Sequence, residues 1–226
     1  MRWTHFCALV AVTGAMLPAQ EDMPDRRLRS AADTLYEIMA APDRAIPRGL
    51  LNRAECIVIV PGMKKAAFVV GGEYGRGFAL CRTAGRWSAP VRLAGGSFGV
   101  QFGADSTDIV LLVMSERGMQ RVLSDKFKIG VDAAAAAGPV GRDATADTDI
   151  LMRAEILSWS RTRGLFAGAA LDGTVVEHDG GETVKLYGGP MNNHEIIAGT
   201  ARVPEAAYIL VRELHEIAPA GVRSNY

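Results

Sequence analysis

The sequence is short of several features that would point to a class of function. Lysine plus arginine and aspartate plus glutamate both number 25, so the net charge is zero. No global electrostatic field therefore attracts nucleic acid or a membrane. No apolar run reaches the roughly 20 residues that a membrane-spanning helix needs. Cys56 and Cys81 have no nearby histidine, so they do not make a zinc-binding pattern. We see no repeat and no low-complexity tract.

Glycine and apolar residues are plentiful. The 25 glycines fall within apolar stretches, and hydrophobic residues make up 49% of the chain. This pattern indicates closely packed strands and tight turns, and the length is sufficient for a real hydrophobic core.

The N-terminal residues have the layout of a secretory signal peptide. Arg2 precedes an apolar run over residues 6–17, and small residues follow with Ala19 at a plausible cleavage point. We expect residues 1–19 to be removed and residues 20–226 to form a single domain. The protein would then be periplasmic or extracellular, and peripheral on a membrane if it binds lipid. A buried N-terminal helix is the alternative.

Two cysteines remain after residue 19. Cys56 and Cys81 each lie in an apolar, strand-like stretch, which favours small buried thiols. A disulfide between them is the less favoured alternative in an exported chain.

An amphipathic helix is predicted over residues 23–40. Leu28, Ala31, Leu35 and Ile38 recur at three- and four-residue spacing, which places them on one face. Three arginines stand near its start: Arg26, Arg27 and Arg29. The favoured interpretation is a helix that packs its apolar face on the domain, and the alternative is a helix that lies on a membrane surface.

The rest of the chain indicates an α+β fold, with a twisted, glycine-rich antiparallel sheet or barrel-like sandwich and helices at both ends. Strand-like runs cover residues 56–60, 66–72, 74–82, 91–103 and 108–114. We expect a short helix over 115–125 with Ser115 as its N-cap, and an extended segment over 127–141. Residues 154–179 suggest a hairpin that turns at Asp172-Gly173. Two further helices are expected near 192–198 and over 204–216.

The stretch GGSFG, residues 95–99, matches the G-x-S-x-G pattern of serine hydrolases. A nucleophilic serine of that kind sits between a strand and a helix. Here Phe98, Val100 and Phe102 alternate with glycine and glutamine after Ser97, which is the period of a strand. The pattern therefore disfavours catalysis by Ser97.

A second glycine cluster, GGEYGRG over residues 71–77, suggests a phosphate-binding loop. Such a loop lies between a strand and a helix, with a lysine and a serine or threonine beyond it. Here another apolar, strand-like run follows. We interpret both glycine clusters as thin parts of a sheet, where another element or a ligand can approach closely.

Several long motifs in order resemble the SYLF domain, also called the Ysc84 actin-binding or DUF500 family. They begin at Ile57 (IVIVPGMKKAAFVVGGEYGRG), Trp87 (WSAPVRLAGGSFGVQFGADSTDIVLLVM), Phe127 (FKIGVDAAAAAGPVGR) and Ala154 (AEILSWSRTRGLFAGAALDG). The resemblance runs from about residue 31 to 198. It implies a non-enzymatic protein without a cofactor: eukaryotic members bind phosphoinositides, in part through an amphipathic N-terminal helix, and fungal members bind and bundle actin.

We expect, on this basis, binding of an anionic lipid headgroup at a membrane surface. The alternative is a protein-interaction module, for actin-like partners by family analogy or for envelope proteins. A serine hydrolase ranks third. Anionic headgroups are bound by arginine and lysine donors next to an apolar surface. The candidate lipid-binding residues are Arg26, Arg27, Arg29, Lys64, Lys65 and Arg76.

Overall fold

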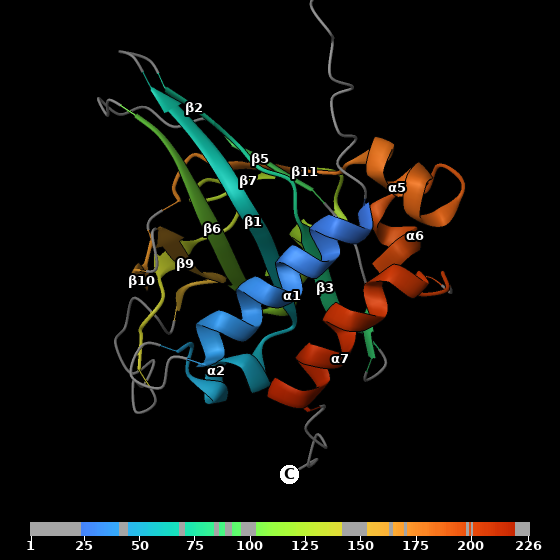
Figure 1. Cartoon of the computed structure of the whole chain (residues 1–226), viewed down its shortest axis with the longest axis horizontal. Coiled ribbons are helices and arrows are strands. Elements are labelled where there is room, and N and C mark those ends of the chain that lie inside the picture. Colours follow the sequence, from blue (N-terminus) through green and yellow to red (C-terminus); the bar gives the residue numbers. More distant parts are fainter. Residues whose placement is uncertain are drawn as a thin grey trace, which may run out of the picture.

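The structure is a computed structural model of the whole chain (Figure 1). It describes residues 24–40, 45–67, 71–83, 86–88, 92–95, 103–141, 153–162, 165–169, 171–197, 199 and 201–219. The expected signal segment (1–19), Ser97 and Gly99 lie outside the described residues.

Helices occur mainly at the two ends of the chain. They are α1 (Pro24–Ala40), α2 (Arg48–Arg53), α3 (Glu116–Leu123), α5 (Gly180–Tyr187), α6 (Asn193–Ile197), the 3-10 turn η1 (Glu205–Ala207) and α7 (Tyr208–Ile217). The predicted helix over 23–40 is confirmed as α1. Ser115 caps α3 as expected, because its hydroxyl accepts a hydrogen bond from the amide of Gly118.

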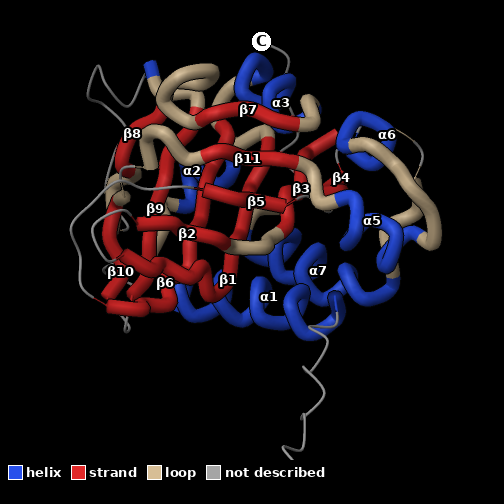
Figure 2. Tube along the Cα trace, turned by 90° about the horizontal axis from the view of Figure 1, so that it is seen from above, coloured by secondary structure: helices blue, strands red, loops and turns tan. Residues whose placement is uncertain are grey.

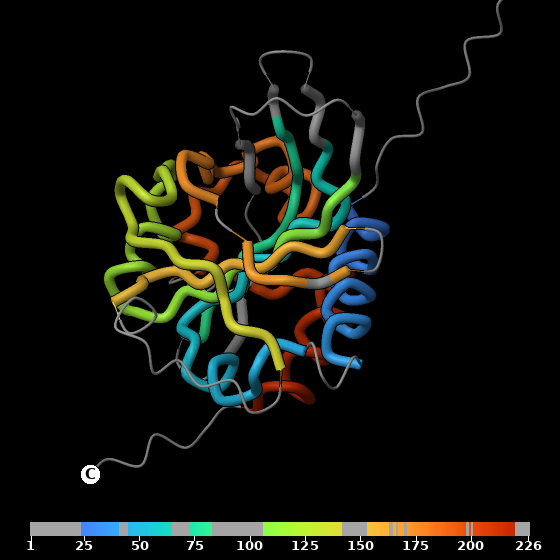
Figure 3. The backbone as a smooth tube through the Cα atoms, turned by 90° about the vertical axis from the view of Figure 1, so that its left-hand side faces the viewer, coloured from blue at the N-terminus to red at the C-terminus, as the bar shows by residue number. Residues whose placement is uncertain are grey.

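The strands form one curled sheet. They are β1 (Cys56–Ala67), β2 (Gly71–Tyr74), β3 (Phe78–Thr83), β4 (Arg86–Ser88), β5 (Arg92–Gly95), β6 (Gly103–Val113), β7 (Lys126–Lys128), β8 (Ala135–Ala137), β9 (Ile156–Thr162), β10 (Leu165–Gly168) and β11 (Val175–Glu177). The main order is β10-β9-β6-β1-β2-β5-β11-β7. Figures 2 and 3 show the curl, which carries β5, β11 and β7 across one face of β1 and β6.

Both faces of the central strands are buried. On the helix side, α1, α2 and α7 pack against Ile57, Ile59 and Trp159 (Figure 1). On the other side, the curled strands and helices α3 and α6 cover Val58, Ile109 and their neighbours. The continuous apolar run at 109–113 is therefore buried on both faces, as its composition predicts.

The α+β class, the flanking helices and the barrel-like curl are confirmed, and the sheet is a curled half-barrel (Figure 2). One detail differs from a purely antiparallel sheet, because β8 pairs with β9 in parallel. The alanine-rich segment 127–141 is not helical, as expected: it contains most of β7 and all of β8, which are extended, and a turn at residues 130–132 between them.

The hairpin predicted at Asp172-Gly173 is wrong. A turn does occur there, with Gly173 at a φ of 89°. The strands on its two sides do not pair with each other, however: β10 pairs with β9, whereas β11 pairs with β5 and β7. Alternating apolar residues identified strands but not their partners.

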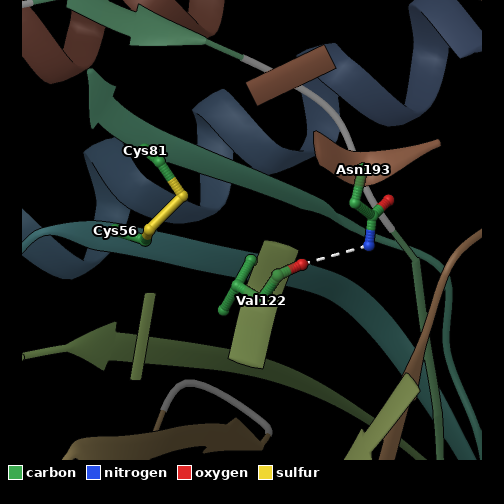
Figure 4. The surroundings of a disulfide bond; sticks show 4 residues. All are labelled: Cys56, Cys81, Val122 and Asn193. Atoms are coloured by element: carbon green, nitrogen blue, oxygen red, sulfur yellow. Dashed lines mark hydrogen bonds between the residues drawn. A yellow bond between two sulfur atoms is a disulfide. The ribbon is translucent and has the colours of Figure 1, made fainter. Parts of the chain in front are cut away.

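Cys56 and Cys81 form a disulfide (Figure 4). They are directly opposed in the antiparallel pair β1–β3, with Cα atoms 4.0 Å apart, and both are fully buried. Burial was expected, but the preference for free thiols is corrected. In the same apolar layer, the Asn193 side chain of α6 donates to the carbonyl of Val122 in α3.

Candidate functional site: a polar groove beside helix α1

A polar groove of about 450 Å³ lies between α1 and the sheet that α1 covers. We call it the α1 groove. The apolar stripe of α1 faces the core, so the neighbouring stripe at positions i, i+4 and i+7 forms one wall. The opposite wall comes from β1, β6 and β9. The lining residues are Arg26, Arg27, Ser30, Asp33, Thr34, Pro61, Gly62, Asp108 and Arg161.

A bulge in β1 shapes the floor of the groove. The pairing of β1 with β6 shifts between Val60 and Met63, so that two residues of β1, Pro61 and Gly62, lie opposite the single residue Asp108. Gly62 has a φ of 61°, which favours glycine. Its backbone amide donates a hydrogen bond of 2.8 Å to Asp108 Oδ1. The carboxylate of Asp108 thus holds the bulge in place.

Arg161 connects the sheet to α1. Its Nε and Nη2 atoms donate to Asp108 Oδ2 at 2.9 and 2.6 Å, and its Nη1 donates to Glu37 of α1. Burial lowers the pKa of Arg161, but the hydrogen bonds to these two carboxylates outweigh burial and raise the pKa overall. The guanidinium therefore stays charged and is held by two partners.

Arg27, one of the candidate lipid-binding residues, is buried. Its Nη1 donates a hydrogen bond of 2.5 Å to Glu182 of α5, and both side chains are only 6% exposed. Burial raises the pKa of Glu182, and the positive charge of Arg27 opposes that rise. Arg27 therefore anchors α5 to α1 from one end of the groove.

Arg76 occupies a break between β2 and β3. A Cβ atom on Gly75 would lie 2.5 Å from a Val60 methyl, and one on Gly77 would lie 2.1 Å from the carbonyl oxygen of Ile59. The two glycines therefore let the chain lie against the β1 bulge. Between them, Arg76 Nε donates to the Tyr74 hydroxyl at 2.7 Å and lies 3.5 Å from Asp179, the N-cap of α5.

Lys64 lies farther along the sheet. It is in register with Tyr74 of β2 and Ser106 of β6, and its Nζ donates to the Ser106 hydroxyl at 3.1 Å. Lys64 is exposed. Lys65 is the next residue of β1, paired with Glu73, and its side chain lies outside the description.

The structure therefore separates the six candidate residues. Arg26 and Arg27 line the α1 groove, and only Arg26 is exposed there. Arg29 is exposed on α1 but does not line the groove. Lys64 lies on β1 and Arg76 in the break between β2 and β3, and neither of these two lines the groove. Lys65 belongs to β1, and its side chain is not among those described.

Sequence reasoning missed the carboxylates that organise the site. Asp108 stands directly before a buried apolar run. An acidic residue next to such a run is a signal that could have marked it as a candidate site residue. Asp179 and Glu182 form a D-x-x-E pattern, which marks the start of a helix. That pattern would have predicted α5, in which Asp179 accepts from the Glu182 amide at 3.1 Å.

The described side chains offer no metal site. No group of three or more histidine, cysteine, aspartate or glutamate residues within the described ranges is placed to hold a metal ion. His178 contacts Asn193 Oδ1 at 2.6 Å and the Thr183 hydroxyl at 3.4 Å, which gives it a structural role between α5 and α6. No helix in the described segments is both long and apolar enough to cross a bilayer.

Comparison with known proteins identifies relatives over most of the chain. The chain is 34% identical over 176 residues to the SH3 domain-containing protein PJ696.02 of Schizosaccharomyces pombe, covering 75% of this chain and 41% of that protein. It is 32% identical over 179 residues to Protein YSC84 of Saccharomyces cerevisiae, covering 76% of this chain and 38% of that protein. It is 31% identical over 199 residues to the SH3 domain-containing YSC84-like protein 1 of Xenopus laevis, covering 84% and 58%.

The chain thus spans about two fifths of the fungal relatives and somewhat more than half of the Xenopus protein. Residues 94–217, more than half of the chain, match the family Ysc84, described as "Las17-binding protein actin regulator". The expected resemblance is confirmed, and this chain belongs to the Ysc84 family.

Proposed function

We propose that this chain is a non-enzymatic protein-binding domain and that the α1 groove is its binding surface. One observation carries the proposal: the groove fixes both signs of charge close together, with Arg26 and Arg161 beside Asp33 and Asp108. The two carboxylates weaken the attraction that the arginines exert on a uniformly anionic surface. A protein surface can present complementary charges of both signs, and such complementarity gives specificity.

The family supports the same choice. Its description names a binding protein and an actin regulator, and the relatives above are named for their SH3 domains or as YSC84-like proteins. The named partners, Las17 and actin, are therefore the first candidates for this chain. An envelope protein is the candidate if the chain is exported.

The experiment measures co-sedimentation with purified actin filaments and pull-down of purified Las17. Arg26→Glu reverses one charge of the groove. Arg29→Glu is its matched control, because Arg29 lies on the same helix, is exposed and does not line the groove. We expect Arg26→Glu to weaken binding about tenfold or more, because opposite charges become like charges, and Arg29→Glu to leave binding within about twofold. Equal losses of binding in the two variants would show that the α1 groove is not the binding surface. If the wild type binds neither actin nor Las17, these proteins are not partners of this chain.

A second candidate function is binding of an anionic lipid headgroup, of a phosphoinositide or another phospholipid. A specific observation favours it: Arg26 and Arg29 are both exposed on α1, and neither makes an ion pair with a described residue. Such arginines can contact phosphate groups. The apolar stripe of α1 faces the core, so this function rests on charge and not on insertion of the helix.

We further propose that the protein works outside the cytoplasm. The Cys56–Cys81 disulfide supports this, because such bonds persist in oxidising compartments. Mature protein from the native source should begin near Gln20, and native material that retains Met1 would contradict cleavage. Ser97 has no catalytic role in this proposal, so covalent labelling of Ser97 by a fluorophosphonate would revive the hydrolase alternative.

A further inference from the structure

Helix α7 has an apolar surface on its outer side as well as on its inner side. Leu210, Leu214 and Ile217 are buried in the core against α1. On the outer side, a hollow of about 510 Å³ is lined by Tyr208, Ile209, Val211, Arg212 and His215. We call it the α7 hollow. It shares no residue with the α1 groove.

The α7 hollow combines an exposed aromatic anchor with apolar neighbours. Tyr208 is 55% exposed, although it starts a helix whose other face is in the core. Ile209 and Val211 are half-buried beside it. Tyrosine is enriched in the residues that dominate protein interfaces, because it offers a large contact area with little conformational freedom to lose.

The spacing of the lining residues fits another helix. Tyr208, Val211, Arg212 and His215 occupy positions i, i+3, i+4 and i+7, so they form one stripe along α7. A helix that lies along such a stripe presents apolar residues at the same spacing. The stripe is about two turns long, which matches a short amphipathic helix.

The charges at the hollow select the partner. Arg212 and His215 are exposed, and neither has a hydrogen-bond or ion-pair partner among the described residues. The carboxylates of Glu213 and Glu216 do not line the hollow. A partner with carboxylates beside its apolar stripe would neutralise the Arg212 charge. A second copy of this chain is disfavoured, because a symmetric pairing along the stripe brings Arg212 close to its own counterpart.

We propose that the α7 hollow binds an acidic amphipathic helix of a partner protein. The proposal concerns a surface apart from the α1 groove, so its failure and that of the groove proposal are distinguishable.

Two synthetic helical peptides of equal length serve as probes. Both have leucines at i, i+3, i+4 and i+7; one has glutamates and the other lysines at the flanking positions. Titration is followed by fluorescence anisotropy of labelled peptide at low salt, with the full chain. We expect the acidic peptide to bind at least about tenfold more tightly than the basic one, because only it complements the charge at the rim.

Three variants separate the outcomes. Tyr208→Ala should abolish binding of both peptides, and Arg212→Glu should reverse the preference between them. Arg202→Glu, an exposed residue that does not line the hollow, should change nothing. Circular dichroism verifies that each variant is folded.

Four results would overturn the proposal. These are equal affinity for the two peptides, an Arg212→Glu variant that keeps the original preference, a concentration-dependent dimer that Tyr208→Ala dissolves, or sedimentation with anionic vesicles that Tyr208→Ala removes. The last two would assign the hollow to a second copy or to a membrane.

Discussion

Arg27 and Glu182 are 155 residues apart in sequence, yet their side chains meet in a 2.5 Å hydrogen-bonded ion pair that is almost fully buried. The pair joins the first described helix, α1, to α5. Because α1 is one wall of the α1 groove, the pair also fixes that wall. A buried pair is costly to break, since removing one partner leaves the other charge without water and without a counterion.

Replacing Arg27 tests this anchor. Arg27→Met should lower the free energy of unfolding at pH 7 by about 3–5 kcal/mol, because Glu182 is left buried without its hydrogen-bonded partner. The double variant Arg27→Met, Glu182→Leu should recover most of that loss. Urea unfolding measures all three proteins. Arg26→Met is the control, since the neighbouring arginine is exposed and its loss should change stability by no more than about 0.5 kcal/mol.

The pH dependence of stability follows from Glu182. Burial raises its pKa in the folded protein above the ordinary value of 4.5, with Arg27 opposing the rise. The folded state therefore holds this proton more tightly than the unfolded chain, so the contribution of Glu182 is greatest below about pH 4.5 and is lost as the pH rises through the raised pKa. Relative to Glu182→Gln, which cannot titrate, the wild type should lose stability between pH 4 and pH 7. A constant difference across this range would show that the Glu182 pKa is not raised.

Gly77 tests the close approach of the β2–β3 break to β1. In Gly77→Ala, the new Cβ would lie 2.1 Å from the Ile59 carbonyl oxygen and 2.8 Å from the Val60 Cα, and backbone atoms cannot move aside cheaply. We expect a loss of about 3 kcal/mol or more. Gly49→Ala is the matched control: no atom lies within 4 Å of its Cβ position in α2, so the variant should be about 0.5 kcal/mol more stable. Equal melting temperatures for the two variants would refute the packing at Gly77.

Local patterns predicted local structure well. The apolar spacing from Leu28 to Ile38 and the Ser115 cap depend on residues within one or two turns, and both are found as predicted. Helix α5 was missed because Gly180 and Gly181 look like a loop, although Asp179 and Glu182 carry the capping signal. The hairpin at Asp172-Gly173 was wrong because β11 finds its partners in β5 and β7, which are distant in sequence.

The site was less predictable than the fold. Runs of arginine and lysine were visible, but their partners were not, because Arg161 reaches Asp108 only through the register of β6 and β9. Arg27 looked equivalent to Arg26 and Arg29 in sequence. Arg27 lies on the side of α1 next to the buried apolar face, so its side chain is buried in the structure. Such differences come from the packing of α5 on α1, which one sequence does not reveal.

The disulfide is open to direct measurement. Cys56 and Cys81 close a segment with a sequence separation of 25, and a cross-link of that span stabilises mainly by restricting the unfolded chain. Cys56→Ala with Cys81→Ala should lower the free energy of unfolding by about 3 kcal/mol. Reduced wild type should lose a similar amount. Unreduced native protein that yields two thiols at these positions after denaturation would contradict the pairing.

The lipid function has a prediction that separates it from protein binding. Near an anionic surface each arginine contributes about 1 kcal/mol, so Arg26→Gln with Arg29→Gln should weaken binding to anionic vesicles by a factor of about 30. Arg27 is left in place because its guanidinium is buried against Glu182. The control replaces Arg121 and Arg202, two exposed arginines elsewhere, and so removes the same net charge.

Vesicle co-sedimentation at about 0.1 M and about 1 M salt measures both variants, because screening shortens the reach of surface charges from about 10 Å to about 3 Å. If α1 contacts the membrane, only the α1 variant should lose binding, and the difference should vanish at high salt. Equal losses in the two variants would mean that net charge alone drives sedimentation. In that case the exposed arginines of α1 do not form a lipid-binding site, and the proposed role of Arg26 is restricted to protein binding in the α1 groove.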